Sequence, residues 1–138
     1  MSHNIYTMEP KLVTDPELSG ILQELASLEP IFHCPELNMT RTDLEKLTTH
    51  DFWEVGASGH RYSKEFVLGV LEKRLAEKKI DHWQTSDFYC RKLAQDMYLL
   101  TYTLIQNHDR RTLRSSIWQR TTEGWKAVYH QGTVVQDF

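Results

Sequence analysis

The chain has 138 residues, of which 40% are apolar and 25% are charged, and its formal net charge is −3. This length suits one domain with one hydrophobic core, and the composition is that of an ordinary globular protein. Both charge signs are mixed along the sequence, so we expect no nucleic-acid partner. No apolar run approaches the roughly 20 residues that a membrane-spanning helix needs, so we expect no membrane partner.

The residues that commonly bind metals or cofactors form no recognisable motif. Cys34 and Cys90 fit no zinc-binding spacing, and the histidines form no HxH or HxxxH pair with a supporting carboxylate. No glycine-rich stretch resembles a phosphate-binding loop, so the sequence predicts neither a metal nor a cofactor. The sequence opens without the pattern of a signal peptide, and we therefore expect free thiols and a cytoplasmic protein.

The first part of the chain predicts an arm and a helix. Residues 1–14 are polar and mixed, and we expect a flexible arm there, ahead of a single domain over residues 15–138. Asp15-Pro16-Glu17 is typical of a helix start. The apolar residues that follow recur at helical spacing (Leu18, Ile21, Leu22, Leu25 and Leu28). Pro30 should end or kink this helix.

Two further helices and a strand are expected next. Thr42-Asp43-Leu44-Glu45 predicts a capping box and a short helix over about 43–49. A strand over 51–55 should follow, and then a reversal in which Gly56 and Gly59 supply positive φ. Ser63 should cap a third helix, whose expected apolar face is Phe66, Val67, Val70, Leu71 and Leu75.

After Ile80 the hydrophobic period changes to two, which predicts strands near 83–93, 97–107, 112–120 and 125–135. Helices first and a meander of long strands after them indicate an α+β fold. We expect three N-terminal helices packed on one face of a strongly curved antiparallel sheet.

The register of the last hairpin decides which side chains share a face. A three-residue turn with a bulge at Gly124 gives three predicted pairs: Thr121 with Trp125, Trp118 with Val128, and Ser116 with His130. Arg114 and Trp118 would then share a face with His130. A four-residue turn moves His130 to the other face, and both turns remain open from the sequence, with the bulged one favoured.

Five residues placed within apolar strands are the candidates for a ligand-binding pocket: Glu54, Tyr102, Arg114, Trp118 and His130. An arginine beside aromatic rings suits a carboxylate or another flat polar ligand. Glu54 and His130 are also the candidate acid–base groups, because burial shifts the pKa of such side chains. Alternatively, Glu54 faces water or pairs with an arginine such as Arg114, His130 is structural, and the aromatic residues are packing.

From residue 15 to about residue 135 the sequence resembles the nuclear transport factor 2-like superfamily, which includes the ketosteroid isomerase-like proteins. Three segments carry the resemblance: DFWEVGASG at 51–59, RSSIWQR at 114–120 and GWKAVYHQGT at 124–133. They are most similar to an uncharacterised bacterial branch, and the last hairpin is similar to that of the association domain of the calcium/calmodulin-dependent kinase. The resemblance implies a cone-shaped fold with a pocket at its open end, and homodimers formed sheet against sheet.

The superfamily hosts isomerases, dehydratases, polyketide cyclases, transport and scaffold proteins, and immunity proteins, so the fold alone does not give the reaction. Its catalytic members use an acidic base with a tyrosine acid, or a His–Asp pair, and this sequence matches neither set. The leading hypothesis is therefore a domain that binds a small molecule or a peptide. The alternatives are a proton-transfer enzyme (isomerase, dehydratase or polyketide-cyclase-like) and a protein–protein interaction module such as an immunity or assembly domain.

Overall fold

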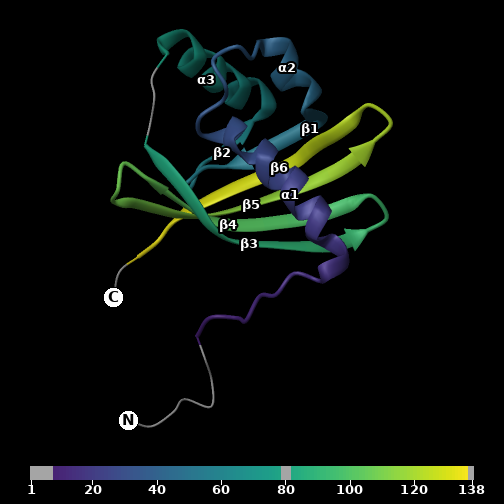
Figure 1. Ribbon diagram of the computed structural model, residues 1–138. Coiled ribbons are helices and arrows are strands. Elements are labelled where there is room, and N and C mark those ends of the chain that lie inside the picture. Colours follow the sequence, from purple (N-terminus) through teal and green to yellow (C-terminus); the bar gives the residue numbers. More distant parts are fainter. Residues whose placement is uncertain (1–7, 79–81, 137–138) are drawn as a thin grey trace.

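Three helices lie over one face of a curved six-stranded sheet (Figure 1). The structure is a computed structural model that describes residues 8–78 and 82–136. The helical elements are η1 (Pro16–Leu18), α1 (Ser19–Leu28), η2 (Glu29–Phe32), α2 (Arg41–Lys46) and α3 (Lys64–Glu77). The strands are β1 (Thr48–Val55), β2 (Arg61–Ser63), β3 (Trp83–Ala94), β4 (Met97–Gln106), β5 (Arg110–Thr121) and β6 (Gly124–Val134). The α+β prediction is confirmed.

The strand order is β2-β1-β6-β5-β4-β3, and one pair of neighbours departs from the antiparallel sheet that we predicted. β1 and β6 are parallel, with Glu54 beside His130, whereas every other neighbouring pair is antiparallel. Parallel neighbours need a long connection rather than a tight turn. The segment between β1 and β6 contains a helix and four strands, so no hairpin fixes their relative direction.

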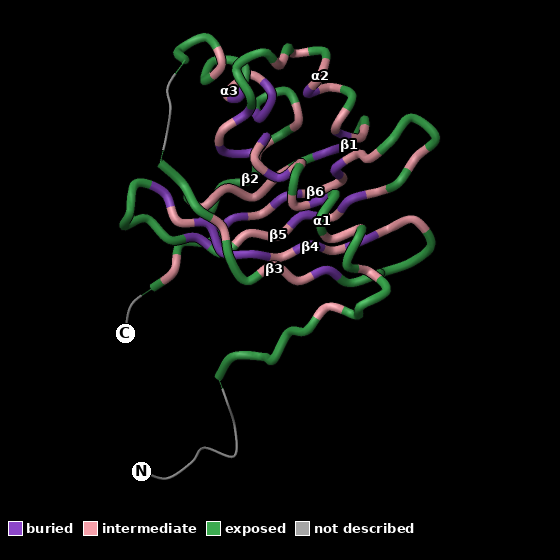
Figure 2. The backbone as a smooth tube through the Cα atoms, in the orientation of Figure 1, coloured by how far each residue is buried: buried purple, intermediate pink, exposed green. Residues whose placement is uncertain are grey.

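The buried residues lie between the helices and the inner face of the sheet. Figure 2 shows buried segments along β4, β5 and β6, where side chains alternate between the two faces. The sheet is irregular at two places in β3, and Asp87 there has a positive φ of 60°. Such bulges bend a sheet, which lets it curve around the helices. Among the described residues, no helix is long and apolar enough to cross a membrane.

The last hairpin reaches the predicted pairing of Ser116 with His130 by a different route. Its turn has two residues, because Thr121 pairs with Gly124, and Trp118 therefore lies opposite Ala127 instead of Val128. The predicted three-residue turn is wrong. The register shifts by one between Trp118 and Ile117, which leaves Val128 as a bulge. Because of this bulge, His130 lies on the inner face of the sheet. The sequence analysis predicted the same face, but it placed the bulge at the turn.

The second helix starts two residues earlier than expected. Its N-cap is Thr40, whose side chain accepts a hydrogen bond from the Asp43 backbone N–H, while the Asp43 carboxylate accepts one from the Thr40 N–H. Thr42 is therefore not the cap, and β1 already begins at Thr48. Two T-x-x-[DE] patterns overlap here, and Thr40 is the threonine that has the extended backbone of an N-cap.

The third helix is capped by Ser63 as predicted. Its buried face differs from the prediction, because Leu68 is buried and Phe66 is 54% exposed. In the preceding turn only Gly59 has a positive φ, of 90°. Gly56 is needed for another reason, since a Cβ atom there would lie 2.7 Å from the Tyr62 ring.

Before the first helix, residues 8–14 form no helix or strand. The Thr14 hydroxyl accepts a hydrogen bond of 3.1 Å from the Cys90 N–H, which attaches this segment to the edge strand β3. The rest of the expected arm, residues 1–7, lies outside the described residues.

Candidate functional site

A carboxylate that the sequence analysis did not single out lies at the centre of the fold. Glu29 is the first residue of η2, directly after α1, and its side chain is completely buried. The sequence carries a signal for this burial. Glu29 follows Leu22 by seven residues and Leu25 by four, so it continues the apolar stripe of α1.

Three side chains on the inner face of the sheet donate hydrogen bonds to the Glu29 carboxylate. Tyr102 Oη and Ser116 Oγ donate to Oε1 over 2.7 and 3.0 Å, and Trp118 Nε1 donates to Oε2 over 2.7 Å. Burial raises the pKa of Glu29 to about 7, although the three hydrogen bonds and the positive charge of Arg114 lower it. Glu29 can therefore exchange a proton near neutral pH.

The Glu29 cluster continues through Ser116 to His130. Ser116 Oγ lies 2.6 Å from His130 Nδ1, and the single hydroxyl hydrogen of Ser116 is donated to Glu29. The hydrogen-bond network therefore assigns the ring proton of His130 to Nδ1 and leaves Nε2 as an acceptor. Burial and the charges of Arg114 and His33 lower the pKa of His130 well below 6.5, so the ring is neutral. Phe32 stacks on it with a centroid distance of 4.1 Å.

His130 Nε2 faces Arg114, whose Nη1 lies 3.4 Å away. The guanidinium is oriented by a hydrogen bond of 3.0 Å from Nε to Thr112 Oγ1. It lies against the backbone of Gly132, where a Cβ atom would be 3.3 Å from Nε. The ion pairs of the described residues do not include Arg114, so no carboxylate neutralises it directly.

Arg114 and His130 form part of the wall of an interior cavity of about 280 Å³. The exposed residues Ser58, Phe66 and Arg110 also line it, so its mouth is bordered by the β1–β2 turn, the first turn of α3 and the start of β5. The other lining residues are Phe32, His33, Glu54, Val55, Gly56, Ala57, Tyr62, Val67, Val70, Leu71, Arg74, Gln106 and Gly132.

The five candidate residues divide into two groups. Glu54, Arg114 and His130 line the cavity. Tyr102 and Trp118 do not line it. They donate hydrogen bonds to the buried Glu29 carboxylate, and so belong to the hydrogen-bond network beneath the cavity wall. All five residues lie on the inner face of the sheet.

Glu54 is half-buried and lies beside His130 in the register of β1 and β6. Burial raises its pKa, while the positive charges of Arg114 and Arg74 lower it. No ion pair with Arg114 forms, so its carboxylate remains available to the cavity.

His33 is a second residue that sequence reasoning missed. It follows η2, it is 3% exposed, and neither of its ring nitrogens has a hydrogen-bond partner among the described residues. Burial, with the charges of Arg114 and Arg74, lowers its pKa to about 4. No sequence pattern distinguishes this histidine from the exposed ones. In the described part of the chain, no cluster of His, Cys, Asp or Glu is large enough to hold a metal ion.

Comparison with known proteins identifies the fold. A cone of curved sheet around helices, with a cavity at one end, defines an α+β protein of the cystatin-like class. No protein-family model matches the sequence, and no curated protein matches it significantly. Many solved structures do match, and they give the chain the nuclear transport factor 2-like fold.

One similar structure is a nuclear transport factor 2-like protein from Cytophaga hutchinsonii, with 17% identity and a TM-score of 0.63 over 88% of this chain and 100% of the other. Another, from Pseudomonas aeruginosa and of unknown function, has 15% identity and a TM-score of 0.66 over 83% and 97%. A third, from Streptomyces avermitilis, is named as a candidate dehydratase and has 15% identity and a TM-score of 0.66 over 89% and 100%. At such identities the likeness establishes the fold and leaves the reaction to the site itself.

Proposed function

We propose that the protein binds a small organic acid in the interior cavity, with the carboxylate of the ligand beside Arg114. The observation that carries the proposal is the pair of unpartnered ring nitrogens of His33 in the cavity wall. A buried polar atom without a partner costs about 1–3 kcal/mol, and such atoms are rare in folded proteins. The neutral ring has one donor and one acceptor nitrogen, so a ligand that places a carboxylate or carbonyl oxygen at the first and a hydroxyl at the second would satisfy both.

Charge and size support the same class of ligand. Arg114 has free donors at the cavity wall and no direct ion pair, and a planar guanidinium suits a carboxylate. The cavity volume of about 280 Å³ is just below the range of about 300–1,000 Å³ found for drug-sized ligands. A small metabolite fits it better than a peptide does.

Binding of short-chain carboxylic acids tests the proposal, with the corresponding amides as uncharged controls. In titrations followed by calorimetry, Arg114→Gln should weaken binding of an acid about tenfold or more, because a charged hydrogen bond contributes about 1.5–3 kcal/mol. Arg91→Gln is the matched control, since Arg91 is exposed on β3 and does not line the cavity. Equal affinities of wild type and Arg114→Gln for every acid would overturn the proposal.

The chain of hydrogen bonds from Glu29 through Ser116 to His130 favours a second candidate function, acid–base catalysis on the bound acid. With the Arg114 guanidinium turned from His130 Nε2 to the carboxylate of the ligand, Nε2 would take a proton from a carbon atom next to a carbonyl group, and the electron pair would stay on the substrate as an enolate. The Nδ1 proton of His130 would pass to Ser116, and the Ser116 proton to Glu29. The negative charge would thereby move from Glu29 to the substrate beside Arg114.

This candidate predicts that the protein accelerates the exchange of the C3 hydrogens of 2-oxobutyrate for solvent deuterium, measured by NMR. Ser116→Ala should abolish the acceleration and leave binding of 2-oxobutyrate within about threefold, because Ser116 does not line the cavity. Exchange at the uncatalysed rate with bound 2-oxobutyrate would exclude catalysis of this kind and leave the binding function in place.

A further inference from the structure

Glu54 is the acidic residue among the described residues that line the interior cavity, and its carboxylate has no partner there. The side chain is half-buried, and the hydrogen bonds and ion pairs of the described residues do not include it. A carboxylate that has lost part of its water without gaining a donor carries an uncompensated cost of burial. A donor brought by the ligand would remove this cost.

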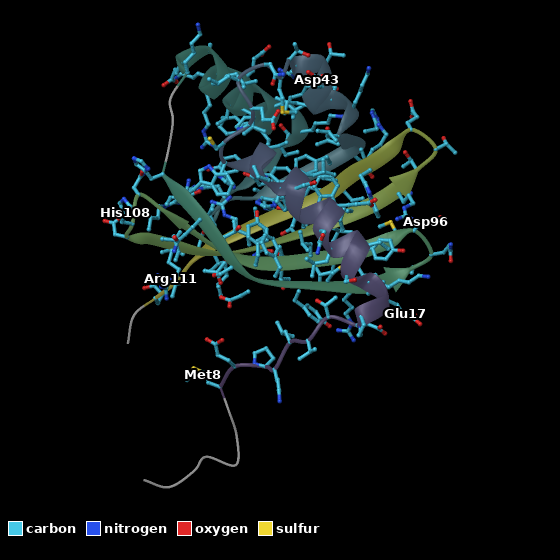
Figure 3. All side chains as sticks on the ribbon, viewed as in Figure 1. Met8, Glu17, Asp43, Asp96, His108 and Arg111 are labelled. Atoms are coloured by element: carbon cyan, nitrogen blue, oxygen red, sulfur yellow. The ribbon has the colours of Figure 1, made fainter. Side chains whose placement is uncertain are left out.

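The other charged groups of the cavity wall are arginines, and two of them are exposed and hydrogen-bonded within the protein. Arg74 is exposed on α3 and donates a hydrogen bond of 3.4 Å to a backbone carbonyl of η2. Arg110 is exposed at the end of the sheet where Figure 3 shows Arg111, and it donates a hydrogen bond of 2.9 Å to the Gln106 side chain. Water screens both charges. The half-buried cation of the wall is therefore Arg114.

Glu54 and Arg114 lie on opposite sides of His130. Glu54 is beside His130 in the register of β1 and β6, and Arg114 Nη1 of β5 lies 3.4 Å from His130 Nε2. Because β6 separates β1 from β5, the backbones of these two strands are about 10 Å apart. Arg114 leans across β6, since its partner in the register is Gly132, which has no side chain. The opposite charges therefore line one cavity from two sides of β6 without forming an ion pair.

His33 also lacks a donor. Its neutral ring has one acceptor nitrogen, and neither ring nitrogen has a partner among the described residues. An ammonium group carries three N–H donors and accepts no hydrogen bond. One ammonium group could therefore donate to the Glu54 carboxylate and keep donors for the acceptor nitrogen of His33, in the place of a hydroxyl group.

We propose that the organic acid is an amino acid, with its carboxylate at Arg114 and its ammonium group at Glu54. This inference rests on the proposed binding function and specifies its ligand class. Each charge of the ligand then meets the unpaired charge of opposite sign in the wall, and hydrogen bonds between charged groups are the stronger kind. The cavity volume of about 280 Å³ favours a small amino acid.

Three sets of probes test the inference in calorimetric titrations of the full-length protein at pH 7.5. The amino acids are glycine, alanine, β-alanine and 4-aminobutyrate. Their parent acids are acetate, propionate and butyrate, and the third set contains the hydroxy acids of the same chain lengths. We expect at least one amino acid to bind about tenfold or more tightly than its parent acid and than its hydroxy acid, because only the ammonium group adds a positive charge beside Glu54.

Variants of the protein assign the gain to its partner. Glu54→Gln keeps the shape of the side chain and removes its charge, so it should abolish the gain and leave the parent acid within about threefold. Glu123→Gln is the matched control, since Glu123 is exposed in the β5–β6 turn and does not line the cavity. Arg114→Gln should weaken the amino acid and the parent acid alike, because both place a carboxylate there.

The outcomes separate the two proposals. If parent acids bind and depend on Arg114, but an amino group adds no affinity in any probe, the amino-acid inference is wrong and the binding function stands. A gain that survives Glu54→Gln also overturns the inference, because the ammonium group is then held elsewhere. A hydroxy acid that binds as tightly as its amino acid overturns it as well, since a neutral donor is then sufficient. If no probe of any set binds, both proposals fail.

Discussion

The indole Nε1 of Trp118 donates a hydrogen bond of 2.7 Å to Oε2 of Glu29, and both side chains are completely buried. The indole N–H can only donate, so it depends on this carboxylate. Replacing Glu29 by leucine would leave Trp118, Tyr102 and Ser116 without their acceptor. We expect Glu29→Leu to lower the free energy of unfolding by at least about 3 kcal/mol, since each stranded donor costs about 1–3 kcal/mol.

Glu29→Gln is the matched control for this loss, because it keeps the shape of the side chain and one acceptor oxygen. It should lower the free energy of unfolding, measured by urea denaturation at pH 7.5, much less than Glu29→Leu does. Equal losses in the two variants would show that volume, and not hydrogen bonding, determines the contribution of this side chain.

The same glutamine variant should change the tautomer of His130. The amide oxygen of residue 29 must face Trp118, so its NH₂ group faces Tyr102 and Ser116, whose hydroxyl oxygens then accept. The Ser116 hydrogen is released to donate to His130 Nδ1, and the ring proton moves to Nε2, which then no longer accepts a hydrogen bond from Arg114 Nη1. Nitrogen-15 NMR at a pH above 7 should report a proton on Nδ1 in the wild type and on Nε2 in Glu29→Gln; the same tautomer in both would contradict the assigned network.

Stability should depend on pH through Glu29 with an unusual sign. The pKa of Glu29 is about 7 in the folded protein against an ordinary value of 4.5, so between these pH values the folded state binds the extra proton. The stabilising contribution is complete below about pH 4.5 and is lost as the pH rises to about 7, by roughly 3 kcal/mol at 1.36 kcal/mol per unit.

The histidines change the stability with pH in the opposite direction, so the contribution of Glu29 must be measured by comparison with a variant. The pKa values of His33 and His130 are lowered, and their protonation therefore destabilises the folded state as the pH falls below 6.5. The difference in unfolding free energy between wild type and Glu29→Gln removes this common contribution. As the pH rises from 4.5 to 7.5, the wild type should lose stability relative to Glu29→Gln. A difference that does not change with pH would show that Glu29 has an ordinary pKa.

Replacement of two glycines by alanine should change the free energy of unfolding with opposite signs. In Gly56→Ala the new Cβ atom would lie 2.7 Å from the Tyr62 ring, which stacks on Phe66 at the cavity mouth. We expect a loss of about 1–3 kcal/mol, as for other overpacked sites. Gly69 lies within α3 and has no heavy atom within 4 Å of an added Cβ, so Gly69→Ala should gain about 0.5–1 kcal/mol. Urea denaturation measures both.

The expected homodimer should use the outer face of the sheet. Trp53 and Leu113 are 44% and 54% exposed there, and Trp53 packs against Tyr129 at 4.7 Å. Leu113→Glu should therefore give a monomer in size-exclusion chromatography with light scattering. Phe66→Glu is the control, since Phe66 is also 54% exposed but lies on α3. A dimer that persists in Leu113→Glu would exclude this face as the interface.

The sequence was sufficient for the order of the three helices and the five long strands, because each has a strong period and a recognisable start. The three-residue strand β2 (Arg61–Ser63) was not predicted, since it is too short to show a period. It was not sufficient for Glu29. A charged residue next to Pro30 was not read as part of the apolar stripe of α1, because its burial depends on donors from residues 102, 116 and 118. Such long-range pairing is invisible to local periodicity.

The site was predicted in part for a similar reason. Period-two alternation placed Arg114 and Trp118 on one face, but it could not say which of the candidate residues line the cavity and which lie beneath it. That division depends on η2, which covers the aromatic donors with Glu29 and Phe32. His33 was missed because its special property, two ring nitrogens without partners, exists only in the folded chain.

The bulge at Val128 means that β6 has one residue more than β5 between the paired positions. This extra residue can lie either in the turn or at Val128. With the extra residue at the turn, Thr121 would pair with Trp125; with it at Val128, as observed, Thr121 pairs with Gly124. Ser116 faces His130 in both arrangements. The part of the hairpin between Trp118 and Ala127, which contains the turn, can therefore change its register by one residue, or Val128 can be deleted, while Ser116 and His130 stay paired. Changes in the turn therefore leave the cavity wall unchanged.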